Sequence, residues 1–541
     1  MRICEWGRGF LYVTSRNRVI MPTRRCANTQ KGEVTMVRAS GVLMPVSSLP
    51  GFVGIGTFGR EAYEFIDFLA RTHQRYWQVL PLTTTSFGDS PYQSFSAFAG
   101  NPYFIDLEDL LDSGYLTKKD LEALPIGHMG MDTVDYGELF QKHRAILERA
   151  LPRFIADPPE DYEEFCKQNA SWLEPYCEFM TIKEQFELHA YYEWPKEYRK
   201  RGKKSAKLCA KHEDDMQYHR MTQYFFYRDW KRLKKYANDH GILIIGDIPI
   251  YVSRDSVEMW SAPEMFCTDK DGTPTCVAGT PPDVFSDTGQ YWGNPIYDWK
   301  QMKKDGFSWW IERLQASLSL YDILRIDHFR GFAAYWAVPF GSPDSSYGKW
   351  VKGPGEAIFD AAKEKLGDLP IIAEDLGFMT PDVIALREHT GFPGMKILQF
   401  GFDSLDSDSD SFDLPHHYSE NTVAYAGTHD NETVVGWFKD SATPKVRKAA
   451  AHYLHMSEDE NIAQAIDRAV AASVSDTCIY RMQDLLGLDN SARINVPSTV
   501  GANWRWRMLP GAITPAIEQE LTDLTYTYFR IPDAKGPELP Q

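Results

Sequence analysis

The sequence predicts an α/β fold, a (β/α)₈ TIM barrel with inserted, mainly helical subdomains on the C-terminal rim. From residue 41 onward, eight short apolar runs rich in β-branched residues alternate with longer helical patterns, as in βα units around a parallel sheet. The runs are almost continuously apolar, which is typical of strands buried on both faces. The 541-residue chain, 43% hydrophobic, is long enough for a barrel with insertions.

The eight predicted strands are unevenly spaced along the chain. They occupy residues 41–49, 76–82, 242–250, 323–329, 370–376, 394–402, 422–430 and 478–486. The second and third runs are too far apart for a single connection, so we expect an inserted helical subdomain at about residues 103–235. A second insertion, rich in Gly, Pro and aromatic residues, is expected at about residues 255–300. Both follow strand ends, which predicts that they project from the C-terminal rim, where active sites of such barrels lie.

The first 35 residues differ in character from the rest of the chain. They contain six arginines and only two acids, Glu5 and Glu33. Arg-rich, acid-poor starts are typical of organelle transit peptides. The alternative is an upstream extension, with the barrel domain at residues 36–541. We favour the N-terminal extension and leave plastid targeting as the second interpretation.

Charge and cysteine content restrict the partners and the compartment. The formal net charge is -17, which excludes a broad electrostatic surface for nucleic acid and is equally poor for an anionic membrane. A neutral substrate fits better. Eight scattered cysteines without C-x-x-C spacing indicate neither a zinc site nor a disulfide framework. With no apolar run of about 18 to 20 residues and no signal-peptide pattern, the prediction is a cytoplasmic protein.

Four acids stand at or just past the C-terminal ends of predicted strands: Asp247, Asp327, Glu374 and Asp430. In a barrel the side chains at these ends point into one shared mouth, so acids far apart in sequence converge. Carboxylates that converge repel one another, which raises some of their pKa values and suits acid/base chemistry. The alternative interpretation of any single acid is an ion pair or a helix cap after its strand.

The neighbours of two of these acids predict opposite roles. Cleavage of a glycosidic bond with retention needs a carboxylate nucleophile and a carboxylic acid about 5 to 5.5 Å apart. Arg325 lies two residues before Asp327, on the same strand face, and is expected to keep that carboxylate ionised. Glu374 follows the apolar residues 371–373, a setting that favours the protonated acid.

Many segments together resemble glycoside hydrolase family 77, the amylomaltases or 4-α-glucanotransferases. The segments, in chain order from about residue 40 to 510, are SSLPGFVGIGTFG, RYWQVLPL, GDSPYQSFSAFAGNPY, GDIPIYV, PPDVFSDTGQYWGNP, RIDHFRG, IIAEDLG, GMKILQF, GTHDNET and NWRWR. The resemblance implies that Asp327 is the nucleophile, Glu374 the acid/base and Asp430 the transition-state stabiliser. The roles inferred from the residues agree with it.

The same resemblance implies a set of substrate-binding residues. They are Tyr92, Asn101, Asp247, Trp292, Asn294, Arg325 and His429. Of these, Trp292 and Asn294 are expected on a loop over the acceptor side, where an aromatic ring suits the C–H face of a sugar. The chain departs from the family pattern at Val284, where the loop usually carries an aromatic residue. This departure puts the acceptor contacts and the preferred donor length in question.

The function that the resemblance implies is 4-α-glucanotransferase activity by a retaining double displacement. An α-1,4-glucan segment would move from a donor to the 4-hydroxyl of an acceptor glucan or glucose. The expected partners are maltooligosaccharides and α-1,4-glucans from starch or glycogen, and neither a cofactor nor a metal is expected. An α-amylase-type hydrolase is the first rival, against which the lack of recognisable calcium-binding loops and of a secretion signal argues. A glucan-binding protein without turnover is the second.

Two short patterns point elsewhere and are set aside. Gly54, Gly56 and Gly59 form a G-x-G-x-x-G match, but a loop separates them from the preceding strand and no acid ends the next one, so a dinucleotide site is not predicted. Asn169 and Asn431 begin glycosylation sequons, which we expect to stay unmodified without a secretory route.

Overall fold

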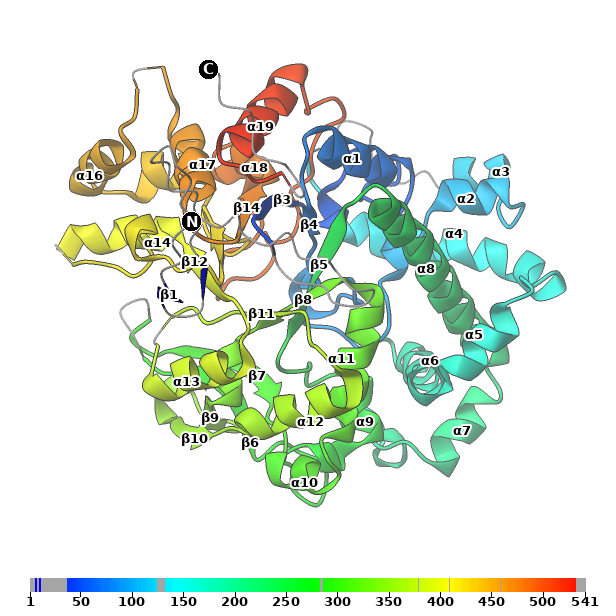
Figure 1. Cartoon of the computed structure of the whole chain (residues 1–541). Helices are drawn as coiled ribbons and strands as arrows, with labels where there is room; N and C mark the ends of the chain where they lie inside the picture. Colours follow the sequence, from blue (N-terminus) through cyan, green and yellow to red (C-terminus); the bar gives the residue numbers. More distant parts are fainter. Residues whose placement is uncertain are drawn as a thin grey trace. The chain divides into compact units, whose positions relative to one another are not determined.

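The computed structural model describes residues 5–6, 9–10, 37–123, 132–282, 286–377, 379–407, 409–457 and 459–531 (Figure 1). The chain divides into two units, and residues 36–532 form the large one. The short strands β1 (Glu5–Trp6) and β2 (Gly9–Phe10) belong to the other unit and pair antiparallel. The predicted N-terminal extension and Met36 otherwise lie outside the described residues.

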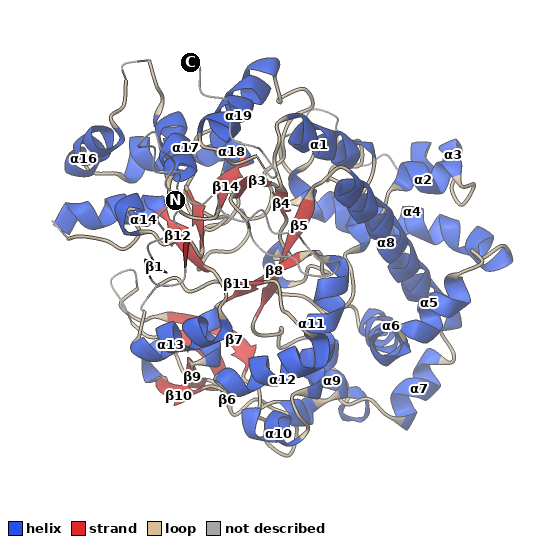
Figure 2. Cartoon of the chain, viewed as in Figure 1, coloured by secondary structure: helices blue, strands red, loops and turns tan. Residues whose placement is uncertain are grey.

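The large unit is built on a closed barrel of eight parallel strands, which helices surround (Figure 2). In chain order the strands are β3 (Ala39–Leu43), β4 (Tyr76–Gln78), β5 (Leu243–Pro249), β8 (Ile323–Asp327), β11 (Ile371–Ala373), β12 (Gly394–Ile397), β13 (Thr422–Tyr425) and β14 (Thr477–Arg481). Around the barrel the order is β11-β12-β13-β14-β3-β4-β5-β8, which then closes on β11. Each strand overlaps one predicted run, so the predicted barrel is confirmed.

Several predicted strands extend past the end of the observed strand, and two of them end in an α-helix. The end of the sixth run forms helix α14 (Leu398–Asp403), and the end of the eighth forms helix α18 (Met482–Leu485). Both segments carry apolar residues that are buried, as at Phe402 and Met482. A short apolar run does not distinguish a buried strand from a buried helix.

A long helical connection joins β4 to β5. Its described helices are α2 (Leu107–Asp112), α3 (Lys118–Glu122), α4 (Tyr136–Ala156), α5 (Tyr162–Gln168), α6 (Ala170–Gln185), α7 (Lys203–Cys209) and α8 (Glu213–Asp239). Gln223 of α8 accepts a hydrogen bond from the Gly100 amide at 2.7 Å and donates one to its carbonyl at 2.9 Å. This pair of bonds fixes the loop that follows β4 against the helices.

A small antiparallel sheet follows the third barrel strand. It consists of β6 (Cys276–Thr280), β7 (Gln290–Pro295), β9 (Ala334–Pro339) and β10 (Lys349–Lys352), in the order β10-β9-β6-β7. The segment 255–300, predicted to be loop-rich, contains β6 and β7, and β9 and β10 lie beyond it and were not predicted. Because β9 pairs with β6, the sheet joins the connections that follow two neighbouring barrel strands, β5 and β8.

The remaining helices complete the large unit. They are α1 (Arg60–Arg71), α9 (Val257–Ser261), α10 (Trp299–Lys304), α11 (Ser308–Leu320), α12 (Glu356–Leu366), α13 (Pro381–Thr390), α15 (Val434–Gly436), α16 (Pro444–Leu454), α17 (Ile462–Ala472) and α19 (Pro515–Thr527). Gly56 lies in the loop before α1, where a Cβ atom would collide with the carbonyl oxygen of Val46. Close backbone packing therefore accounts for this glycine of the G-x-G-x-x-G match. Within the described residues, no helix has the length and apolarity to cross a membrane.

Candidate active site

Strand register brings the predicted acids to one end of the barrel. Asp247 on β5 pairs with Arg325 on β8, and Ile326 on β8 pairs with Ala373 on β11. Asp327 directly follows Ile326 on β8, and Glu374 directly follows Ala373 at the end of β11. They therefore leave neighbouring strands at the same level, at the C-terminal mouth where barrel side chains converge.

Arg325 links two of the acids. Its Nη1 lies 2.6 Å from Oδ2 of Asp247, and its Nη2 lies 3.0 Å from Oδ1 of Asp327. The Tyr92 hydroxyl donates a second hydrogen bond to Asp247 at 2.8 Å. The Asp247 side chain is 0% exposed and that of Asp327 is 30% exposed. Asp247 thus holds the Arg325 guanidinium from a buried position, while Asp327 is accessible to a ligand.

Glu374 has an environment that favours its neutral form. Burial, followed by the negative charge of Asp327, raises the pKa of Glu374 to about 8. Each carboxyl oxygen lies near one backbone N–H: the His328 amide donates to Oε2 at 2.7 Å and the Leu376 amide donates to Oε1 at 3.1 Å. These bonds fix the orientation of the group, and its raised pKa favours the protonated form at neutral pH.

Asp430 stands on the loop after β13. The side-chain Nδ2 of Asn495 donates a hydrogen bond to Oδ1 of Asp430 at 2.6 Å, and Nε2 of His429 lies 3.4 Å from the same oxygen. Arg481, at the end of β14, is buried and donates to the Thr428 carbonyl at 2.8 Å. The loop is therefore anchored to the neighbouring strand, and the carboxylate of Asp430 is 40% exposed.

Two groups of aromatic rings accompany the acids. The Tyr92 ring stacks on the His429 ring with centroids 5.2 Å apart, and Trp504 packs at 5.6 Å from Tyr92. In the second group the Trp292 ring meets the His328 ring edge-on, with centroids 4.8 Å apart. Carboxylates beside aromatic rings are suited to a polyhydroxylated ring, whose hydroxyls need polar partners and whose C–H faces pack on aromatic rings.

Comparison with known proteins agrees with this chemistry. The family model of glycoside hydrolase family 77, described as 4-alpha-glucanotransferase, matches residues 44–513. The chain belongs to this family. The 4-alpha-glucanotransferase of Streptococcus pneumoniae serotype 4 is 54% identical over 498 residues, which cover 91% of this chain and 98% of that protein. The 4-alpha-glucanotransferase of Thermus thermophilus is 45% identical over 490 residues, which cover 88% and 96% of the two chains.

A solved structure of the family is similar throughout. The amylomaltase of Streptococcus agalactiae, determined in complex with acarbose, superimposes with a TM-score of 0.88 at 48% sequence identity. The superposition covers 91% of this chain and 99% of the other. The activity of this glucanotransferase family, the transfer of glucan segments, is accordingly the activity of this chain.

In this glucanotransferase, the side chains of two residues expected to bind substrate form hydrogen bonds with the protein backbone. Asn101 is buried, and its Oδ1 accepts a hydrogen bond from the Tyr103 amide at 3.1 Å, which caps a short 3₁₀ helix. Asn294 is also buried, and its Nδ2 donates to the Val252 carbonyl at 2.9 Å. Neither is hydrogen-bonded to the three acids. The loop position Val284 lies outside the described residues.

The remaining predicted residues share the mouth. Asp247, Arg325 and Tyr92 form one hydrogen-bonded group with Asp327. His429 joins Tyr92 to Asp430 through its ring contacts. The fold thus brings the predicted acids close to Arg325, Tyr92 and His429.

Sequence reasoning missed three residues of the site. Asn495, the hydrogen-bond donor to Asp430, lies in a stretch without regular structure and carries no pattern that would single it out. His328 turns the chain after β8 in a left-handed conformation (φ 56°), which presents its amide to Glu374. Trp504 packs on Tyr92 and His429, and its place in the NWRWR segment was the only available signal.

Proposed function

We propose that Asp327, Glu374 and Asp430 carry out glucan transfer as nucleophile, acid/base and transition-state stabiliser. The observation that supports these roles best is the difference between two acids on neighbouring strands. Asp327 lies 3.0 Å from the Arg325 guanidinium, whereas burial raises the pKa of Glu374 to about 8. One group is thus suited to attack as an anion and the other to donate a proton.

The first displacement forms a covalent glycosyl-enzyme. An oxygen of Asp327 attacks the anomeric carbon of the donor, and the bond from that carbon to the glycosidic oxygen breaks. Glu374 gives its proton to this oxygen, which leaves as the 4-hydroxyl of the departing glucan. Asp430 faces the developing positive charge of the sugar ring, and Asn495 holds its carboxylate in place at 2.6 Å.

The second displacement transfers the glycosyl group to an acceptor. Glu374, now ionised, takes the proton of the acceptor's 4-hydroxyl, and that oxygen displaces Asp327 from the anomeric carbon. The acid regains its proton and the nucleophile its charge. Two inversions give net retention, so an α-1,4 linkage is replaced by another α-1,4 linkage at little cost in free energy.

We infer that the substrates are maltooligosaccharides and longer α-1,4-glucans. The stacked pair Tyr92 and His429 and the ring of Trp292 offer apolar surfaces for successive glucose units. The complex of the Streptococcus agalactiae relative with acarbose supports a site for an oligosaccharide. Transfer in place of hydrolysis needs an acceptor that outcompetes water, and aromatic contacts beside the acid/base favour a bound sugar over a water molecule.

Incubation of the purified enzyme with maltotriose alone tests the transfer mechanism. We expect glucose to appear together with maltopentaose and longer chains, while the total number of reducing ends stays constant. A steady rise in reducing ends, with glucose and maltose as sole products, would identify a hydrolase and contradict the proposed acceptor preference. No turnover at all would favour the glucan-binding alternative.

We also infer a cytoplasmic location. The six cysteines among the described residues are free thiols, which suit a reducing compartment. Fractionation of cells followed by detection with an antibody tests this; recovery of the enzyme outside the cytoplasmic fraction would contradict it.

A further inference from the structure

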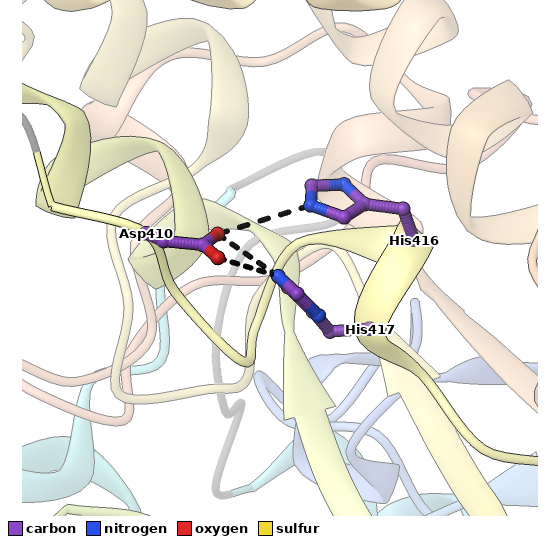
Figure 3. A group of neighbouring side chains, drawn as sticks. All are labelled: Asp410, His416 and His417. Carbon is purple, nitrogen blue, oxygen red and sulfur yellow. Dashed lines mark hydrogen bonds and ion pairs between the residues drawn. The ribbon is translucent and has the colours of Figure 1, made fainter.

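Two adjacent histidines and an aspartate form a cluster outside the catalytic mouth (Figure 3). His416 and His417 end a short 3₁₀ helix, Pro415–His417, and Asp410 lies on the loop before it. One potential ligand atom from each residue lies within 4.8 Å of the others. Figure 3 shows the two imidazole rings turned toward the Asp410 carboxylate from the same side. None of the proposed catalytic residues belongs to this cluster.

The spacing of the three groups fits a small metal ion. Nε2 of His417 lies 2.9 Å from Oδ2 of Asp410, and Nε2 of His416 lies 3.8 Å from Oδ1 of the same carboxylate. Ligands about 2.0 to 2.1 Å from a tetrahedral zinc ion are separated by roughly 3.3 Å. The two measured separations lie on either side of this value.

A neighbouring helix orients one of the histidines. Nδ1 of His416 lies 2.9 Å from the hydroxyl of Tyr453 on α16. This contact occupies the ring nitrogen that faces away from Asp410 and leaves Nε2 toward the carboxylate. Metal-binding histidines are typically held in this way, with the second ring nitrogen bonded to a protein group that fixes the ring and its tautomer.

The charge of the segment that carries the cluster favours a cation. Residues 403–420 contain six acids and neither lysine nor arginine. The side chains of Asp410, His416 and His417 are 70%, 51% and 31% exposed, so an ion reaches them from solvent and water completes its coordination. Two imidazoles with one carboxylate favour a zinc-type ion over Mg²⁺ or Ca²⁺, which prefer oxygen ligands.

We propose that Asp410, His416 and His417 bind a divalent transition-metal ion of the zinc class. The ion stabilises the loop that carries them. On one side Tyr453 connects the cluster to α16; on the other, Oδ1 of Asp413 accepts a hydrogen bond from the Ile397 amide at the end of β12. The site is structural, and glucan transfer does not require it.

Calorimetric titration of the untagged, chelator-treated enzyme with Zn²⁺ tests the proposal. We expect one ion per chain and a higher melting temperature in its presence. The variants H416A, H417A and D410A should each weaken binding at least tenfold. Y453F should weaken it about 10- to 100-fold, the range known for partners that orient a metal-binding histidine. Transfer activity without the metal should equal that of the wild type in all four variants.

A matched control distinguishes this site from adventitious binding by exposed histidines. His389 is 39% exposed and lies 2.8 Å from Asp360 and 3.8 Å from Glu356, so it offers one histidine and two carboxylates. H389A should bind Zn²⁺ as the wild type does. Wild-type affinity in the H416A/H417A double variant, or no binding by the wild type at micromolar Zn²⁺, would overturn the proposal.

Discussion

Replacement of Asn495 by alanine tests whether a single hydrogen bond positions Asp430 for catalysis. The Asn495 amide donates to the carboxylate at 2.6 Å. Hydrogen bonds to charged groups contribute about 1.5 to 3 kcal/mol, and each 1.36 kcal/mol changes a rate about tenfold. Because Asp430 is 40% exposed, water replaces part of the lost bond, so we expect the lower end of this range. The value of kcat/KM should fall about tenfold.

The assay is the rate of glucose release from maltotriose, with kcat and KM determined separately. If Asn495 holds Asp430 for the transition state, N495A should lower kcat and leave KM nearly unchanged. Asn461 provides the control, because its side chain caps α17 by accepting from the Gln464 amide at 3.0 Å. N461A should lower the melting temperature without changing kcat. A wild-type kcat in N495A would refute the positioning role.

Three further predictions follow from the same contacts. Y92F removes the 2.8 Å hydrogen bond to buried Asp247 and should destabilise the fold by about 1 to 3 kcal/mol, measured by urea unfolding; an unchanged midpoint would contradict this. The raised pKa of Glu374, about 8 against an ordinary value of 4.5, means that the folded protein binds this proton more tightly than the unfolded chain does. Its stabilising contribution is therefore fully present below pH 4.5 and is lost as the pH rises from there to about 8. The free energy of unfolding of the wild type should fall relative to that of E374Q over this range, and transfer activity should fall as the pH rises through about 8; a stability difference that does not change with pH would exclude the shift. W292A removes the ring that packs on His328 and should raise the fraction of donor lost to water, measured as new reducing ends per glucose released; an unchanged fraction would exclude an acceptor role.

The barrel could be predicted because its strands are buried on both faces. The continuous apolar runs, such as residues 242–250, are a direct consequence of this burial. Their ends were less certain: Leu398–Asp403 is as apolar as the strand before it but forms a helix. Burial explains why both segments are apolar, but an apolar run does not reveal whether the backbone is a strand or a helix.

The small antiparallel sheet was missed for a different reason. Its strands β9 and β10 follow β8 in sequence, but β9 pairs with β6, which lies more than 50 residues earlier. Only the folded barrel brings these connections together. Short strands with exposed residues, such as Lys349–Lys352, lack the apolar run by which the barrel strands were recognised.

The acids could be located from the sequence because strand ends in a barrel meet in space. The partners that hold them could not. The His328 amide reaches Glu374 because a residue just after β8 adopts a positive φ, and Asn495 reaches Asp430 from 65 residues away. Contacts of this kind depend on loop conformation, which neither periodicity nor composition reveals.

Trapping the covalent intermediate tests the central claim most directly. An α-maltosyl fluoride donor needs no protonation of its leaving group, so the E374Q variant should still form the glycosyl-enzyme but should transfer it slowly. The account predicts that mass spectrometry finds a maltosyl group on the peptide that contains Asp327, and that D327N forms no adduct. An adduct on Glu374 in D327N, or on Asp430 in either variant, would contradict the proposed roles.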